Sequence, residues 1–156
     1  MSLIDVAAAA LEHGCNKVLI VNTWKGNPGK IVLYELRERR LQQVPPIVYI
    51  KGVVLRRELR YSPYKSTRVK ISSMGYYIDP SIHDSNVLAL LNFFFSFLEF
   101  RRYTSLAKID DGMAFVHALL VAKSIIKLEI KMRKEDHFID LGPIIKAVFM
   151  DVPKNV

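Results

Sequence analysis

The residues that most suggest chemistry are the glycines and lysines of the segment NTWKGNPGK, residues 22–30. Such a segment can hold a phosphate on backbone N–H groups when it has the P-loop spacing, or the G-x-G-x-x-G spacing, and leads into a helix. Here Gly26 and Gly29 are only three positions apart, and the apolar run KIVLYEL follows. We therefore predict a hairpin turn built on Asn27, Pro28 and Gly29 rather than a nucleotide-binding loop.

Other reactive residue types do not combine into a catalytic or metal-binding pattern. Asp110 and Asp111 are adjacent, which makes a metal-dependent nuclease a remote alternative, but acids at a helix start are common for structural reasons. The single cysteine, Cys15, excludes an internal disulfide and is expected to be buried. We expect no enzymatic activity, no metal and no cofactor. The histidines are scattered without the spacing of metal ligands: His13, His83, His117 and His137.

The positive charge of the chain is concentrated in one segment. The formal net charge is +8, and residues 24–70 hold twelve Lys and Arg against three Glu. The rest of the chain is close to neutral. A basic stripe confined to one segment is typical of a phosphate-binding surface, although a solvated basic face remains the alternative.

Aromatic residues are interleaved with these cations. Arginine binds phosphate through two parallel hydrogen bonds, and aromatic rings stack on unpaired bases, which favours structured RNA with single-stranded loops over duplex DNA. Tyr34 and Tyr49 are expected to pack in the core, because tyrosines in strands usually do. The predicted RNA-binding residues are Lys25, Lys30, Arg56, Arg57, Arg60, Tyr61, Tyr64, Lys65 and Arg68.

Hydrophobic patterning predicts a single domain, residues 1–156, with a mixed α/β fold. A first helix begins after a cap formed by Ser2 and Asp5, and it ends before Gly14. The apolar run 86–100 is too short to span a membrane and predicts a core helix or a central strand, and its length and the caps at Asp84 and Ser85 favour the helix. Residues 110–123, DDGMAFVHALLVAK, predict another helix. With no export signal evident, we expect a soluble, cytoplasmic protein.

Six or seven strands are expected between these helices. The run KVLIV is typical of a strand covered on both faces. Pro45 and Pro46 make the segment RERRLQQVPP a connector, because proline disrupts a central strand. A bulge is expected at Gly52. The other expected strands are 30–36, 47–55, 69–78, 124–134 with one wet face, and one or two within 139–152.

Three of these segments together resemble the archaeal Brix-domain proteins. They are AAAALEHGCNKVLIVNTWKGNPGKIVLYEL, IVYIKGVVLRRE, and IIKLEIKMRKEDHFIDLGPIIKAVFM with its Gly-Pro. The resemblance implies two similar α/β halves, approximately 1–78 and 79–156, related to the anticodon-binding domain of class II aminoacyl-tRNA synthetases. It also implies a non-catalytic role in ribosome biogenesis through binding ribosomal RNA or its precursor.

The sequence departs from the Brix pattern at its start. Family members usually open with a strand carrying a T-S-R-type sequence and a helix with T-R-x-F, and neither is present here. We therefore expect an incomplete N-terminal half whose open sheet edge could pair with another chain, so the protein is a monomer or an edge-strand dimer. The alternatives to RNA binding are a protein-interaction module that contacts other ribosome-assembly proteins and a tRNA-binding accessory domain.

Overall fold

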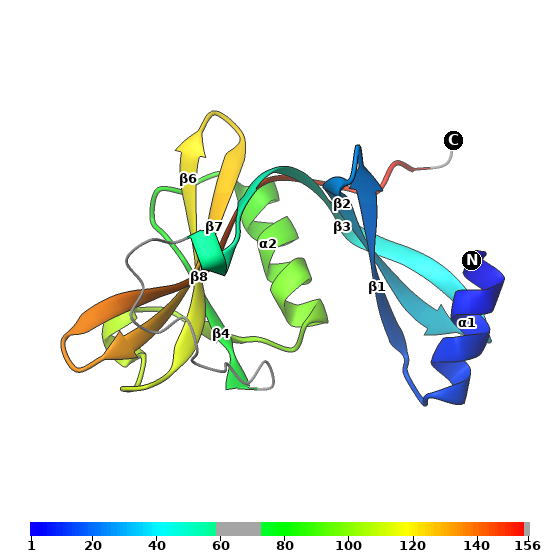
Figure 1. Cartoon of the computed structure of the whole chain (residues 1–156), viewed down its shortest axis with the longest axis horizontal. Helices are drawn as coiled ribbons and strands as arrows, with labels where there is room; N and C mark the ends of the chain where they lie inside the picture. The colour runs from blue at the N-terminus through cyan, green and yellow to red at the C-terminus, as the bar shows by residue number, and fades with distance from the viewer. Residues whose placement is uncertain (59–72, 155–156) are drawn as a thin grey trace.

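A computed structural model describes residues 1–58 and 73–154. Within these ranges the chain forms one eight-stranded mixed sheet, in the order β1-β2-β3-β8-β7-β6-β4-β5, with two α-helices (Figure 1). The mixed α/β fold is therefore as expected. None of the described helices has the length and apolar character needed to cross a bilayer.

The first group of elements is a helix followed by three antiparallel strands. The Ser2 and Asp5 side chains cap the helix reciprocally, as predicted, and Gly14 follows its end with φ +67°. The bulge at Gly52 is also present, because the pairing of β3 with β8 shifts there. The elements are α1 (Leu3–Glu12), β1 (Lys17–Trp24), β2 (Asn27–Arg37) and β3 (Arg40–Val54), which ends before the 3-10 turn η1 (Arg56–Glu58).

The second group also contains a helix and three antiparallel strands, and it has two further short strands at its outer edge. The second helix begins after Asp84, whose carboxylate accepts hydrogen bonds from two backbone N–H groups, and three antiparallel strands follow. Two short strands pair in parallel outside them. The elements are β4 (Gly75–Ile78), α2 (Ser85–Phe97), β5 (Arg101–Tyr103), η3 (Leu106–Lys108), β6 (Ala114–Ala122), β7 (Ile125–Lys134) and β8 (His137–Met150).

The two groups share a local irregularity as well as their order. The strand register shifts opposite Pro45–Pro46 in β3 and opposite Gly142–Pro143 in β8, and both prolyl bonds are cis. These two strands pair with each other at the centre of the sheet. The chain thus has two similar α/β halves joined by main-chain hydrogen bonds.

The main core lies around α2, which sits between the two groups of strands (Figure 1). Its buried residues include Phe95 and Leu91 from the helix, together with Leu33 and Val48 from the first group. Helix α1 lies on the outer side of the first group, where it contacts β3. The strands of the first group are therefore covered from two sides only over part of their length.

The helix predicted over residues 110–123 is wrong, because this segment contains β6. Phe115, Val116 and Ala118 are all buried, so both faces of the strand are covered. Such a strand has a continuous apolar run with no alternation, and a buried helix has the same appearance in sequence.

The connector predicted around Pro45 and Pro46 is also wrong, since both prolines lie within β3. Val44 pairs with Leu33 and Val48 pairs with Ile31, so no partner in β2 falls opposite the prolines. Pairing with β8 begins only at residue 47. The prolines therefore stand where neither ladder requires their missing N–H, which is how a central strand tolerates them.

Strand β1 is not covered on both faces as predicted. It forms one edge of the sheet, and its Leu19 and Val21 side chains are exposed. No other described strand pairs with its outer side, so within the described ranges the expected open edge of the N-terminal half lies at this strand. Cys15, which directly precedes this region, is exposed rather than buried.

Candidate nucleic-acid interface

The turn between β1 and β2 consists of Lys25 and Gly26, not of Asn27, Pro28 and Gly29. Both turn residues have positive φ, +49° and +79°. This is the pattern of a type I′ hairpin, whose twist matches the twist of the flanking strands. The three residues first assigned to the turn instead begin β2.

A bulge follows immediately in β2 and shapes the end of the hairpin. Asn22 pairs with Lys30 and Thr23 pairs with Pro28, which leaves Gly29 as the extra residue. A Cβ atom at Gly29 would lie 2.9 Å from the Cβ of Trp24, closer than two such atoms approach. Glycine is therefore required here, because any larger residue would clash with Trp24 on the neighbouring strand.

Strand register then aligns the polar side chains of three strands. Asn22, Lys30 and Tyr49 stand opposite one another on β1, β2 and β3. Trp24 and Lys51 each lie two residues further along their strands. Because side chains alternate along a strand, Trp24 projects from the same face as Asn22. Lys51 is the extra residue at the β3 bulge, where alternation is interrupted, and it lines the same groove as Trp24.

These side chains line an open groove of about 730 Å³ at the hairpin end of the sheet. The groove is lined by Lys25, Lys30 and Lys51 and has no acidic residue in its wall. None of the three lysines has an acidic partner within 4.0 Å among the described residues. The Trp24 side chain is 70% exposed. Unpaired cations beside an accessible aromatic ring are suited to bind phosphate and base together.

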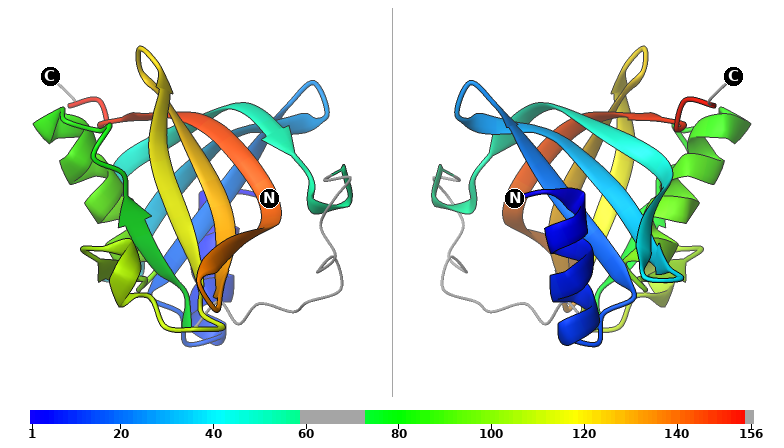
Figure 2. Two further views of the ribbon diagram at one scale, coloured as in Figure 1. Left: turned by 90° about the vertical axis from the view of Figure 1, so that its left-hand side faces the viewer. Right: turned by 90° about the vertical axis from the view of Figure 1, so that its right-hand side faces the viewer.

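The groove contains only part of the predicted RNA-binding set. Lys25 and Lys30 line it, whereas Arg56 and Arg57 belong to η1, which follows β3 outside the groove. In both views of Figure 2, the hairpin tip and the far end of β3 lie on the same side of the molecule. The remaining predicted residues lie outside the described ranges: Arg60, Tyr61, Tyr64, Lys65 and Arg68.

Three aromatic or basic residues of the groove were not assigned to the site from the sequence. Lys51 and Trp24 belong to the basic and aromatic segment, but only strand register shows that they converge with Lys30. Tyr49 was expected to be packed. It is half-buried and also lines the groove.

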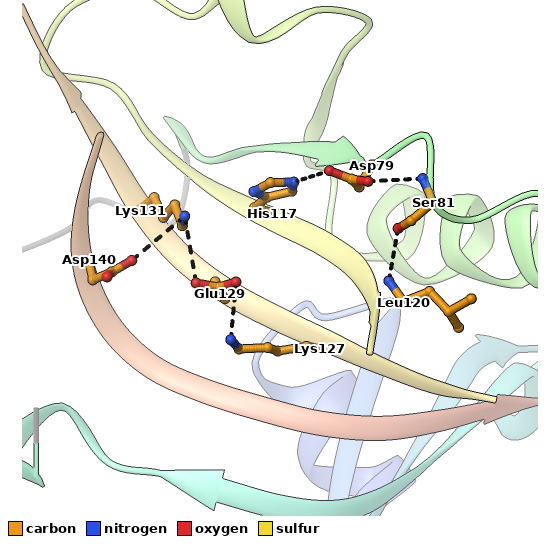
Figure 3. A network of polar contacts seen from close by, with 8 residues as sticks. All are labelled: Asp79, Ser81, His117, Leu120, Lys127, Glu129, Lys131 and Asp140. Atoms are coloured by element: carbon orange, nitrogen blue, oxygen red, sulfur yellow. Dashed lines mark hydrogen bonds and ion pairs between the residues drawn. The ribbon is translucent and has the colours of Figure 1, made fainter. Parts of the chain in front are cut away.

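A second polar cluster lies in the other half of the sheet (Figure 3). Asp79 accepts a hydrogen bond from the backbone N–H of Ser81, and its carboxylate lies 3.0 Å from Nε2 of His117. The Ser81 hydroxyl accepts a hydrogen bond from the backbone N–H of Leu120. The carboxylate therefore stands between serine and histidine, whereas a nucleophilic serine needs the imidazole beside its own oxygen. This geometry stabilises the β4–α2 connection against β6.

Next to this cluster, the face of β7 expected to be wet is largely covered. Glu129 is only 9% exposed, and its carboxylate lies 3.4 Å from Lys127 Nζ and 3.6 Å from Lys131 Nζ. Lys131 also lies 3.9 Å from Asp140 on β8 (Figure 3). Two cations flanking a buried carboxylate satisfy its charge, so these lysines are engaged within the protein.

The Asp79 cluster leads to a prediction about pH. Burial alone would raise the pKa of Asp79, but hydrogen bonds from Ser81 and His117 outweigh it and hold the pKa below 3.8. A lowered pKa in the folded state stabilises the fold above the unfolded value, and this contribution is lost as pH falls through the folded value. In urea titrations, Asp79→Asn should be less stable than the native protein near pH 7. Its stability should also decline less between about pH 5 and pH 2.

The exposed Asp136, in the turn between β7 and β8, provides the matched control. Asp136→Asn removes the same charge and should leave the native pH dependence in place. If the free energy of unfolding of the native protein and of Asp79→Asn changes with pH in the same way, Asp79 is not a source of the pH dependence.

In the parts of the chain that the structure describes, no group of three or more His, Cys, Asp or Glu side chains gathers as a metal site. No protein-family model and no curated protein match the chain. Among solved structures, the chain is similar to a probable ribosomal biogenesis protein from Aeropyrum pernix K1. The two share 19% sequence identity with a TM-score of 0.68, over 95% of this chain and 76% of that chain. At this identity the similarity establishes a common fold.

Proposed function

We propose that this protein is a non-catalytic RNA-binding factor of the Brix type that acts in ribosome biogenesis, in the cytoplasm, by binding ribosomal RNA or its precursor. The fold similarity to a probable ribosomal biogenesis protein supports a role in ribosome biogenesis. The net charge of residues 24–70 supports the class of ligand.

The observation that carries the proposal is the groove at the end of β1 and β2. Lys25, Lys30 and Lys51 bring three unpaired positive charges to one surface, next to Trp24 and Tyr49. Within the described second half, by contrast, Lys127 and Lys131 are paired with Glu129. The three groove lysines, unlike these two, are therefore available to bind phosphate.

Salt dependence of binding tests this function. Each phosphate that a lysine neutralises contributes about 0.7 to the slope of log affinity against log salt for single strands, so three contacts give a slope of about −2. Affinity for a ribosomal-RNA fragment should then fall about 15-fold between about 50 and 200 mM salt. Filter binding measures this directly, and a flat titration would contradict RNA binding. Competition with tRNA distinguishes a tRNA-binding domain.

A protein-interaction module is the second candidate, and the β1 edge is the observation that favours it. Exposed Leu19 and Val21 lie on a strand with a free edge, a combination that favours pairing with a strand of another protein. Ribosome-assembly partners retained in a pull-down after nuclease treatment would support this candidate. Partners released by nuclease would support RNA as the bridge.

A further inference from the structure

We infer that the groove binds an unpaired nucleotide of single-stranded RNA, with its base stacked on the indole of Trp24 and its phosphates held by Lys25, Lys30 and Lys51. This inference rests on the proposed function and specifies its ligand. A duplex is excluded from this mode because its bases are stacked on one another and do not present a free face.

The exposure of Trp24 is the first argument. An indole is among the most apolar side chains, yet this one is 70% exposed at the end of a hairpin. The β1–β2 pairing and the bulge place its Cβ next to Gly29, so the ring starts from a defined point of the sheet. An accessible aromatic ring on a strand is the kind of platform on which single-stranded nucleic acids stack their bases.

The arrangement of charge around the ring is the second argument. Lys25 follows Trp24 in the turn, while Lys30 and Lys51 come from the two neighbouring strands. Cations from the turn and from two strands that line one groove with the ring can contact the phosphates on either side of a stacked base. In the second half, the β6–β7 turn carries Lys123, but the large exposed apolar residues near it are Leu120 and Val121, which are aliphatic and offer no ring.

Two asparagines supply polar groups beside the ring. Asn22 lies in the same row as Lys30, and Asn27 pairs with Trp24 across the hairpin. A side-chain amide carries both donors and an acceptor, which can pair with the edge of a base that is splayed out of its strand. The groove volume of about 730 Å³ also lies within the range of about 300–1,000 Å³ that small-molecule sites occupy.

Intrinsic fluorescence provides a direct test, because Trp24 is the single tryptophan of the chain. The probes are an unstructured RNA of about ten nucleotides and the same RNA annealed to its complement. The single strand should quench Trp24 fluorescence, and the duplex should not. Anisotropy of labelled RNA should show that Trp24→Ala weakens single-strand binding about 5- to 100-fold, with most of the affinity restored in Trp24→Phe.

Phe93→Ala is the matched control, because Phe93 is also an exposed aromatic residue, located on α2. It should bind both RNAs as the native protein does, and circular dichroism verifies the fold of every variant. If Trp24→Ala binds the single strand normally while the combined variant Lys25→Asn, Lys30→Gln and Lys51→Gln binds it more weakly, the stacking inference is wrong and the proposed function stands. If the native protein binds neither RNA nor a ribosomal-RNA fragment, both are wrong.

Discussion

Replacing the three groove lysines together should weaken binding of a ribosomal-RNA fragment by about 50-fold at about 0.15 M salt. The reason is the loss of three phosphate contacts, which also lowers the salt slope by about 2. The variant is Lys25→Asn, Lys30→Gln and Lys51→Gln. Asparagine is chosen in the turn because Lys25 has φ +49°, a conformation that asparagine tolerates well. Filter binding at several salt concentrations measures both quantities.

A control must distinguish the loss of groove contacts from the loss of net positive charge. Lys108, Lys123 and Lys154 are exposed and do not line the groove. Replacing these three with glutamine removes the same three charges from a formal net charge of +8. This control should lose only a small part of the affinity, through the weaker long-range field. Equal losses in both variants would show that the protein binds RNA by its net charge and not through the groove.

The hairpin shows what local sequence does and does not determine. The turn was predictable because two glycines and a proline separate two apolar runs, but its position was not. Lys25 and Gly26 form the turn with positive φ, whereas the sequence placed the turn on the three residues that follow them. The bulge at Gly29 depends on how β1 and β2 pair, and only that pairing brings Trp24 close to the Gly29 backbone.

The positive charge of the groove was predictable from the sequence, but the set of residues that line it was not. Lys25 and Lys30 are close in sequence to Trp24, so their convergence follows from the hairpin itself. Tyr49 and Lys51 follow Lys30 by about twenty residues and reach the groove through the long β3 strand. This strand was not predicted as continuous, because Pro45 and Pro46 lie within it. Two prolines predict an interruption unless the strand register shifts at that point, and sequence alone carries no signal for such a shift.

The helix α2 was predictable because local and tertiary signals agree in it. Asp84 caps its start, and its length fits a helix better than a strand. The same criteria gave a wrong prediction for β6, because Asp110 and Asp111 precede an equally apolar run but do not cap a helix. Asp111 instead accepts a hydrogen bond from the backbone N–H of Glu135, across the turn between β7 and β8. Asp111 therefore makes a contact between residues distant in sequence, although its position before an apolar run is also typical of a helix start.

Removing the largest buried ring of α2 should destabilise the whole protein. Phe95 is 1% exposed, stacks on Tyr76 with a centroid distance of 4.4 Å and contacts Phe94 edge-on at 5.3 Å. Phe95→Ala leaves a cavity at the centre of this cluster and should lower the free energy of unfolding by about 3–5 kcal/mol. For a chain of this size the melting temperature should fall by about 10 °C.

The same variant tests whether the two halves unfold together. Leu33 and Val48 of the first half belong to the same core cluster as Phe95, so a cavity there should destabilise both halves. Trp24 fluorescence reports on the first half and circular dichroism on the whole chain, and both midpoints should shift equally in urea. Phe93→Ala, on the same helix but 55% exposed, should change stability by less than about 1 kcal/mol. A Trp24 transition unmoved by Phe95→Ala would instead mean that the halves are independent domains.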